Sequence, residues 1–286
     1  MKDRSNIQNL KSKIPPVCLT VAGHDPSGGA GIVADVETFT TFGCYAACAI
    51  TSLTFQNTTG VYGAAHQTAE TVRRQIEPVL QDFSVAAMKT GMMPTAAIIK
   101  TTARTIKENN LPNLIVDPVV RSTSGFDLID DAALRVLVEK LFPLAVLITP
   151  NLPEAERIAQ MKIKSESDVF QAARTMRNSG AKNILIKGGH FFKGSSAKKS
   201  RTARDFLFIG DEMEILEAEY IETKATHGTG CTLSAAIAAN LALGKSLSES
   251  VEVAKRFVTE AIRTAPLLGS GNPSVNHLMK IVNSES

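Results

Sequence analysis

Short runs of apolar residues alternate along the chain with longer segments in which apolar residues recur every three or four positions. The runs have the length of buried strands, and the longer segments have the period of helices that pack one face against a core. Residues 69–83 and 130–142 are two such helical segments. This alternation predicts a mostly parallel sheet with helices on both faces, which is a three-layer α/β sandwich. The predicted strands are residues 17–23, 44–53, 85–91, 114–120, 145–150 and 183–189.

The pattern changes in the last third of the chain. Residues 205–210 and 212–221 are two apolar segments that meet at a Gly-Asp pair, and this arrangement predicts a β-hairpin. Two long helical segments follow, at 228–244 and 246–265. The segment 228–244 is strongly apolar.

The chain shows no linker that would divide it, so we predict one domain over residues 17–286, preceded by a polar extension of residues 1–16. Residues 193–204 contain five basic residues and three serines, a composition typical of a flexible surface loop. This loop is either a solvated insertion or a lid whose positive charge attracts phosphate.

Composition narrows the possible functions. The 286 residues include 31 basic and 28 acidic side chains, a net charge of +3 that is too balanced to indicate a nucleic-acid partner. No apolar run approaches the roughly 20 residues that span a bilayer, and the N-terminus lacks the apolar core of a secretory signal. We therefore expect a soluble cytoplasmic protein with reduced thiols and no membrane association. Its cysteines are Cys18, Cys44, Cys48 and Cys231.

A glycine-rich segment follows the first predicted strand. The sequence AGHDPSGGAGIVAD contains Gly28, Gly29 and Gly31 and leads into a predicted helix that carries Asp35. Glycines let the backbone approach a ligand closely, and the helix start offers unpaired N–H groups. The spacing is neither that of the dinucleotide fingerprint nor that of a Walker A loop. A simple tight turn between strand and helix is the alternative.

Ligands of open parallel sheets bind beyond the carboxyl ends of the strands, so the residues that follow each strand are candidates for a site. Gln56 and Asn57 follow the second strand, and their amides can each donate and accept, which suits the mixed edge of a heteroaromatic ring. For Asn57, turn formation is the simpler interpretation. Met92 follows the third strand and could pack on a flat ring, although methionine more often fills a core.

Charged and amide side chains follow the next strands. Asp117 interrupts a buried apolar run, and a Mg²⁺–phosphate site would give its carboxylate a partner. Asn151 and Glu154 begin a helix, where capping is the alternative to metal binding. Lys187 ends the sixth strand, where it could contact phosphate or extend its amine to water.

The strongest single element is THGTGCTLSAA, in which Gly228 and Gly230 precede the apolar helix. Consecutive N–H groups and the positive end of the helix would converge there on one anion, such as a phosphoryl group in transfer. Cys231 lies at the same helix start, where the pKa of a thiol tends to fall. A small residue that merely packs at a helix start is the alternative.

Seven motifs in this order resemble the hydroxymethylpyrimidine/phosphomethylpyrimidine kinases of thiamine biosynthesis, members of the ribokinase-like superfamily. The resemblance extends from Val17 to the C-terminal region. The motifs are GHDPSGGAGIVAD, QNT, KTGMM, DPVV, TPNLPEAE, KGGH and THGTGCTLSAA.

The resemblance implies a homodimeric enzyme that uses ATP and Mg²⁺ to phosphorylate hydroxymethylpyrimidine and then its monophosphate. In most of the superfamily the position of Cys231 holds an aspartate general base, whereas the pyrimidine kinases have cysteine, as here. The implied roles are as follows: substrate binding by Gln56, Gly23, Asp35 and Met92; nucleotide and phosphate contacts by Asn151, Lys187 and Thr226; Mg²⁺ binding by Asp117 and Glu154; and catalysis by Cys231, Gly228, Gly230 and Lys187.

Three other functions remain possible on the sequence alone. A pyridoxine or pyridoxal kinase shares the scaffold and also phosphorylates a hydroxymethyl group on a heteroaromatic ring, and one enzyme could have both activities. A thiol-dependent hydrolase or acyltransferase would use Cys231 as nucleophile and His227 or His190 as base. A non-catalytic pyrimidine-binding regulator would bind the ring without consuming ATP.

Overall fold

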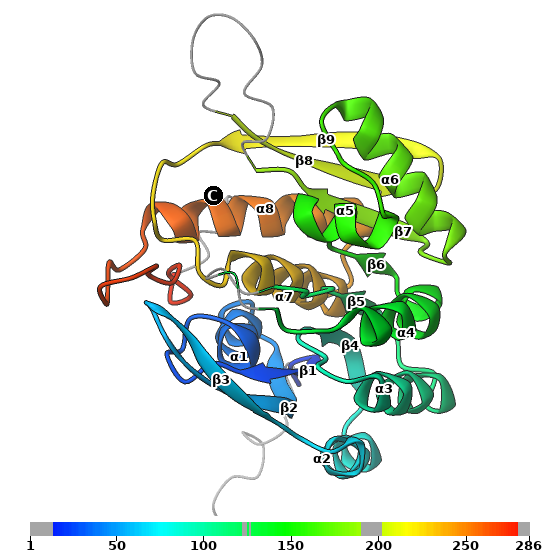
Figure 1. Ribbon diagram of the computed structural model, residues 1–286. Coiled ribbons are helices and arrows are strands. Elements are labelled where there is room, and N and C mark those ends of the chain that lie inside the picture. Colours follow the sequence, from blue (N-terminus) through cyan, green and yellow to red (C-terminus); the bar gives the residue numbers. More distant parts are fainter. Residues whose placement is uncertain (1–13, 122–124, 126, 190–201, 280–286) are drawn as a thin grey trace, which may run out of the picture.

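The computed structural model describes residues 14–121, 125, 127–189 and 202–279 (Figure 1). Within these residues, nine strands form one continuous sheet in the order β3-β2-β1-β4-β5-β6-β7-β8-β9. The strands are β1 (Val17–His24), β2 (Tyr45–Asn57), β3 (Gly60–His66), β4 (Val85–Thr90), β5 (Leu114–Val116), β6 (Leu147–Ile148), β7 (Asn183–Lys187), β8 (Thr202–Ile209) and β9 (Glu212–Glu219).

Six neighbouring strands run parallel, namely β2, β1, β4, β5, β6 and β7. The edge strand β3 at one side and the strands β8 and β9 at the other are antiparallel to their neighbours. The predicted mostly parallel sheet and the predicted C-terminal hairpin are therefore confirmed. The carboxyl ends of the parallel strands meet at one edge of the sheet, and the loops that follow them define the site described below.

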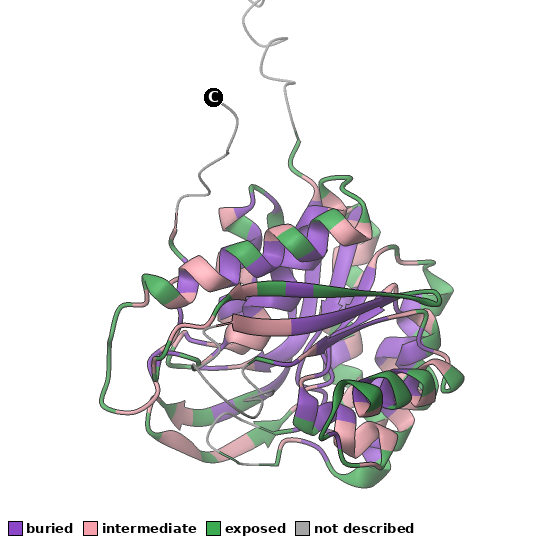
Figure 2. Ribbon diagram, turned by 90° about the horizontal axis from the view of Figure 1, so that it is seen from above, coloured by how far each residue is buried: buried purple, intermediate pink, exposed green. Residues whose placement is uncertain are grey.

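Helices cover both faces of the sheet, so the structure has three layers (Figure 1). One apolar core lies between the sheet and α2 to α6, and a second lies between the sheet and α1, α7 and α8. The sheet residues between the two layers are largely buried (Figure 2). The helices are α1 (Gly31–Thr41), α2 (Ala69–Asp82), α3 (Ala96–Glu108), α4 (Asp131–Leu141), α5 (Leu152–Ala159), α6 (Glu166–Asn178), α7 (Thr229–Ala242) and α8 (Leu247–Arg263).

The central helix of its layer is α7, which lies between α1 and α8 and also contacts strands β4 and β5. Small and apolar residues fill most of its length because it is buried from Thr232 to Asn240. Among the residues that the structure describes, no helix has the length and apolar character needed to cross a membrane.

The sequence analysis missed β3 and the full length of β2. Two glycines and two alanines in β3 weaken the strand signal, because neither residue type favours a sheet. β2 continues past the predicted end at residue 53, since its last residues pair with β3. Gln56 therefore lies on a strand of a β-hairpin and not in a loop after a strand.

The predicted basic loop also needs correction at its end. Residues 202–204 belong to β8, where they pair with residues 217–219 of β9. The ladder of backbone hydrogen bonds therefore extends the hairpin into a stretch whose composition is that of a loop. The rest of that loop, residues 1–13 of the predicted N-terminal extension and His190 lie outside the described residues.

Candidate active site

A cavity of about 630 Å³ opens at the carboxyl ends of the parallel strands. It brings together residues from the glycine-rich loops, from the β2–β3 hairpin and from the loops that follow β4 to β7. Eleven of the twelve predicted site residues line it: Gly23, Gln56, Met92, Asp117, Asn151, Glu154, Lys187, Thr226, Gly228, Gly230 and Cys231.

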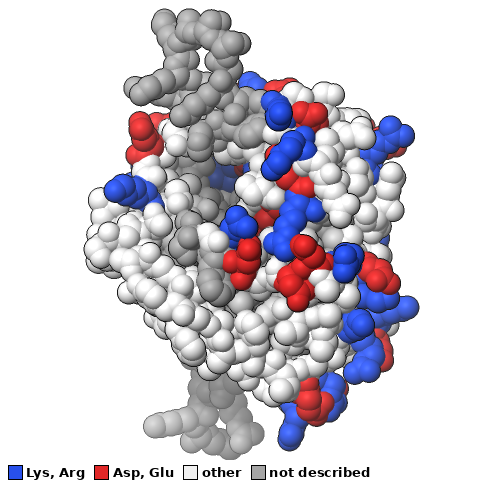
Figure 3. Space-filling view, in the orientation of Figure 1, with Lys and Arg blue, Asp and Glu red and all other residues white. Residues whose placement is uncertain are grey.

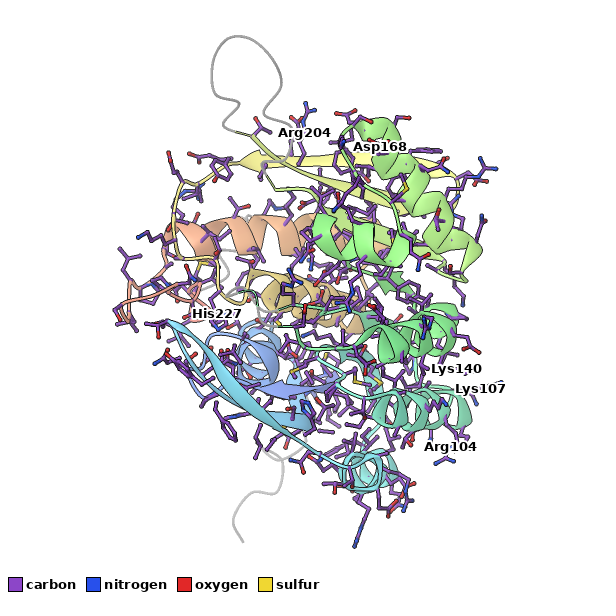
Figure 4. The ribbon with its side chains drawn as sticks, in the orientation of Figure 1. Arg104, Lys107, Lys140, Asp168, Arg204 and His227 are labelled. Carbon is purple, nitrogen blue, oxygen red and sulfur yellow. The ribbon has the colours of Figure 1, made fainter. Side chains whose placement is uncertain are left out.

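Two glycine-rich loops pack directly against each other at this cavity. Gly228 has a φ of +81°, and a Cβ added there would lie 1.8 Å from the carbonyl oxygen of Gly29. Both the left-handed backbone and the close approach require glycine. A hydrogen bond between His227 Nε2 and Asp25 Oδ2, 2.7 Å long, also joins the two loops. His227 is labelled in Figure 4. The first turn of α7 is thereby held at the cavity, which its residues line, and the N–H groups of a helix start have no partners within the helix.

A C-terminal segment completes the loop before α7. His227 donates its backbone N–H to the carbonyl of Pro273 and accepts from the N–H of Val275, each at 3.3 Å. The same segment reaches the turn of the β2–β3 hairpin, where the N–H of Asn272 donates to the carbonyl of Thr58 at 2.7 Å. Residues 272–275 therefore connect the hairpin wall of the cavity to the glycine loop.

Cys231 lies half-buried in the first turn of α7 and lines the cavity. Burial raises the pKa of its thiol to about 11, although Lys89 and the N–H of Gly31 act in the opposite direction. The sequence analysis expected the helix start to lower this pKa, and that expectation is wrong for the ligand-free protein. The cost of placing a thiolate away from water exceeds the stabilisation from the helix end and the nearby cation.

Asp117 and Lys187 form an ion pair on the cavity floor. Lys187 Nζ lies 2.9 Å from Asp117 Oδ1, and Thr149 donates its hydroxyl to the same oxygen at 3.0 Å. Burial alone would raise the pKa of Asp117, but Lys187 and Lys89 lower it below its usual value. Gly230 leaves room for the lysine, because a Cβ there would lie 3.0 Å from Lys187 Nζ.

Glu154 caps α5 and also faces the cavity. Its backbone N–H donates to Asn151 Oδ1 at 2.9 Å, and its Oε2 accepts from the N–H of Asn151 at 2.7 Å, which is a capping box. Burial raises the pKa of Glu154 to about 7 despite the nearby Lys187. The capping alternative is confirmed for this residue. In the described part of the chain, no group of three or more His, Cys, Asp or Glu side chains could hold a metal ion.

The β2–β3 hairpin forms the wall at one end of the cavity. Gln56 donates from Nε2 to Thr54 Oγ1 at 2.7 Å, and its amide oxygen accepts no hydrogen bond from the described residues. Met92 is almost fully buried and packs on Gly23, where a Cβ would lie 2.9 Å from its sulfur. Asn57 accepts from the N–H of Thr59 at 2.9 Å, so its side chain forms a turn, as the simpler interpretation expected.

Asp35 is the one predicted site residue that the structure does not bring to the cavity. Its carboxylate is fully buried and accepts hydrogen bonds from Thr20 at 2.6 Å and from Lys89 at 2.6 and 2.8 Å. The sequence analysis did not single out Lys89. A lysine inside the buried strand β4 was the available signal, because such a charge needs a buried partner.

The opposite end of the cavity was also not predicted. Asp205 of β8 and Lys255 of α8 form an ion pair of 2.6 Å there. Asp205 also accepts from the N–H of Gly188 at 3.0 Å, so this pair fixes the backbone just after Lys187. These residues lie far apart in the sequence, and no local motif marks them.

The fold and the composite cavity define a small-molecule kinase of the ribokinase-like class. Two examples of solved structures that share this fold are a pyridoxal kinase and a phosphomethylpyrimidine kinase. An ADP complex of Bacillus subtilis pyridoxal kinase is 37% identical, with a TM-score of 0.82 and coverage of 92% of this chain and 97% of that chain. A phosphomethylpyrimidine kinase from Clostridium difficile 630 is 38% identical, with a TM-score of 0.74 and coverage of 86% and 99%.

The family follows from sequence comparison. A family model described as phosphomethylpyrimidine kinase matches residues 25–276, and the chain belongs to that family. The hydroxymethylpyrimidine/phosphomethylpyrimidine kinase of Bacillus subtilis strain 168 is 42% identical over 259 residues, which are 91% of this chain and 93% of that protein. The thiamine biosynthesis bifunctional protein ThiED of Geobacter sulfurreducens is 44% identical over 261 residues, 91% of this chain; the chain spans about half of its length, 52%.

Proposed function

We propose that this enzyme transfers the γ-phosphoryl group of ATP to the hydroxymethyl group of hydroxymethylpyrimidine and then phosphorylates the monophosphate to the pyrophosphate. One observation carries the proposal. The cavity joins a wall suited to a flat ring, at Gln56 and Met92, to a glycine-lined helix start that faces the Asp117–Lys187 pair. A ring alcohol and a triphosphate can therefore meet at one point, and alignment supplies much of the catalysis of phosphoryl transfer.

In the first transfer, the substrate hydroxyl oxygen forms a bond to the γ-phosphorus while the bond from that phosphorus to the β-bridging oxygen breaks. The electron pair leaves with ADP, and the hydroxyl proton goes to the sulfur of Cys231 when this residue is in its thiolate form, which is the minor form in the ligand-free protein because burial raises the pKa of the thiol. The N–H groups at the start of α7 and the ammonium of Lys187 stabilise the charge on the transferred group. In the second transfer the acceptor is an ionised phosphate, which needs no base, so the same cradle serves both steps.

The carboxylates on the cavity floor fit Mg²⁺. Oxygen ligands suit this ion, which usually binds through one or two carboxylates together with water and substrate phosphates. Asp117, whose pKa lies below its usual value, and Glu154 would hold it there. When bound, the ion would neutralise charge on the triphosphate. We assign Asn151, Lys187 and Thr226 to the phosphates of the nucleotide, because they lie in the same cavity beside these carboxylates.

Asp35 receives a different role from the one that the family resemblance implied. Because its carboxylate is fully buried against Lys89, we assign it to the support of the site and not to contact with the ring. Gln56, Gly23 and Met92 keep their proposed places around the pyrimidine.

Pyridoxal phosphorylation is a second candidate activity. The fold is shared with pyridoxal kinases, including a Staphylococcus aureus enzyme solved with AMP-PCP and pyridoxal, which is 30% identical with a TM-score of 0.83. Asp25 is hydrogen-bonded to His227 Nε2, as an orienting carboxylate would be, but among the described residues no hydrogen bond joins His227 to Cys231, so the nucleophile of a thiol hydrolase would lack an adjacent base.

We further propose a homodimer and a cytoplasmic location. The β2–β3 hairpin exposes Leu53, Phe55 and Tyr62, with 41%, 56% and 68% of their surface accessible. The surface over this hairpin carries few charged side chains in the space-filling view (Figure 3). If this surface packed against the same surface of a second copy, these side chains would be shielded from water. Sedimentation of the wild type and of a Phe55→Asp/Tyr62→Asp double variant tests the dimer, which the double variant should dissociate.

The proposed activity is tested by incubating the purified protein with ATP, Mg²⁺ and hydroxymethylpyrimidine and by identifying the products by mass. We expect a monophosphate followed by a pyrophosphate, with one ADP formed per phosphoryl group. Pyridoxal is assayed in parallel under the same conditions. Phosphorylation of pyridoxal alone would assign the chain to the second activity, and ADP release without either product would contradict both.

A further inference from the structure

A fully buried ion pair lies beneath the candidate active site and takes no part in the mechanism above. Lys89 and Asp35 have side chains with 0% exposure, and Lys89 Nζ contacts both carboxylate oxygens, at 2.6 and 2.8 Å. Thr20 donates a further hydrogen bond to Asp35 at 2.6 Å. Burying two charges costs solvation energy that their attraction repays only in part. Such a pair is therefore a candidate for a functional role.

The strand pattern places this pair against the first turn of α7. Residues two apart on a strand face the same side of a sheet. Ala87 of β4 belongs to the apolar core that contains α7, so Lys89 faces that same layer. Asp35 comes from α1, which packs against both β1 and α7. The ion pair therefore lies in the layer between β4, α1 and α7, close enough to Cys231 that Lys89 and Cys231 each act on the pKa of the other.

Four charged side chains interact with the thiol of Cys231, namely Lys89, Lys187, Asp35 and Asp117. Lys89 favours its thiolate form, whereas Asp35 and Asp117 disfavour it, and the effect of Lys89 exceeds that of Asp35. The interaction is mutual, because Cys231 also raises the pKa of Lys89 and of Lys187. The cation of the buried pair thus acts more strongly on the sulfur than its anion does.

We propose that Lys89, fixed by Asp35, is a positioning residue that keeps a positive charge beneath the first turn of α7 and so stabilises the thiolate of Cys231. A lysine in water would be mobile and screened, whereas this one is locked in place without solvent. Its relevance to catalysis rests on the proposed function. The protonation of Cys231, however, is measurable without substrate or turnover. Failure of the proposed effect of Lys89 would therefore not imply failure of the proposed kinase activity, nor the reverse.

The experiment measures the rate of iodoacetamide alkylation of Cys231 against pH in the ligand-free protein. The rate follows the thiolate fraction, which changes tenfold per unit of pKa below the midpoint. Exposed Cys48 is replaced by serine in every sample, and peptide mass identifies the modified site. The variants are Lys89→Met and Asp35→Asn. Lys107→Met, on the outer side of α3, is the matched control (Figure 4).

The two variants should act in opposite directions. Lys89→Met removes the stabilising charge and should slow alkylation at pH 8 about tenfold or more, since a nearby opposite charge moves a pKa by a unit or more. Asp35→Asn removes the opposing anion and should accelerate it, and Lys107→Met should leave the rate unchanged. If the Lys89→Met variant does not fold, the nearly isosteric Asp35→Asn variant tests the proposal alone, through the direction in which it changes the alkylation rate of Cys231. A change of the same sign in both variants, or slower alkylation in Asp35→Asn, overturns the proposal.

Discussion

Replacing Gly230 with alanine tests the phosphate cradle without disturbing the fold. Gly230 has no left-handed backbone, so alanine can adopt its conformation, and helix stability should stay the same or rise by up to about 1 kcal/mol. The new methyl group would lie 3.0 Å from Lys187 Nζ and 3.7 Å from Asp117 Oδ2. The lysine must then move by a few tenths of an ångström, and the methyl group takes space next to the transferred phosphoryl group.

The expected loss follows from the interaction that is displaced. A hydrogen bond from a charged group contributes about 1.5–3 kcal/mol, which corresponds to a roughly 10- to 100-fold fall in turnover. Steady-state ADP formation with hydroxymethylpyrimidine measures the fall, and thermal unfolding checks that the fold is intact. Gly60→Ala is the matched control, because its Cβ would meet nothing within 4 Å. Wild-type turnover in Gly230→Ala would refute the reasoning, and so would a loss that a lower melting temperature fully accounts for.

Further predictions concern neighbouring residues. Gly228→Ala should destabilise the protein strongly, because its Cβ would overlap the Gly29 carbonyl at 1.8 Å, and a melting temperature equal to that of wild type would contradict the interlocked loops. Cys231→Ala should lower the first phosphorylation about 100-fold and the second much less, as product masses over time can show; equal losses in both steps would argue against a base role. Glu154→Gln should change the pH dependence of stability. The raised pKa of Glu154, about 7 against 4.5, contributes stability below pH 4.5 that is lost as pH rises through 7, about 3 kcal/mol in all. Urea unfolding measures the free energy of unfolding of wild type and of Glu154→Gln, and the wild-type value should fall by that amount relative to the variant between about pH 4.5 and 8. A difference between the two proteins that stays constant with pH would disprove the raised pKa.

Much of the fold could be predicted because the parallel strands are short apolar runs bounded by helices. The edge of the sheet was harder, since β3 contains small residues whose strand conformation depends on pairing with β2. Local motifs also located eleven of the twelve predicted site residues at the cavity. Most of them lie near the carboxyl end of a strand or at a helix start, where the chain topology brings side chains together, whereas Gln56 lies within β2.

Electrostatic properties could not be predicted in the same way. The partner of Asp35 is Lys89, 54 positions away in the sequence, and no local pattern pairs them. The pKa of Cys231 depends on burial and on charges from β4, α1 and the residue after β5, so the helix start alone gave the wrong direction. Likewise the ion pair of Asp205 with Lys255 joins β8 to α8 and exists only once both are packed.

The stretch that pairs with His227 has a consequence for how the protein is made. Residues 272–275 leave the ribosome after every described strand and helix, yet they complete the turn that presents Gly228. A nascent chain can thus assemble its sheet while its phosphate cradle is still unfinished. The catalytic turn is thus the last part of the site to form during synthesis, and a bulky insertion placed close behind residue 275 would interfere with it before it affected the rest of the molecule.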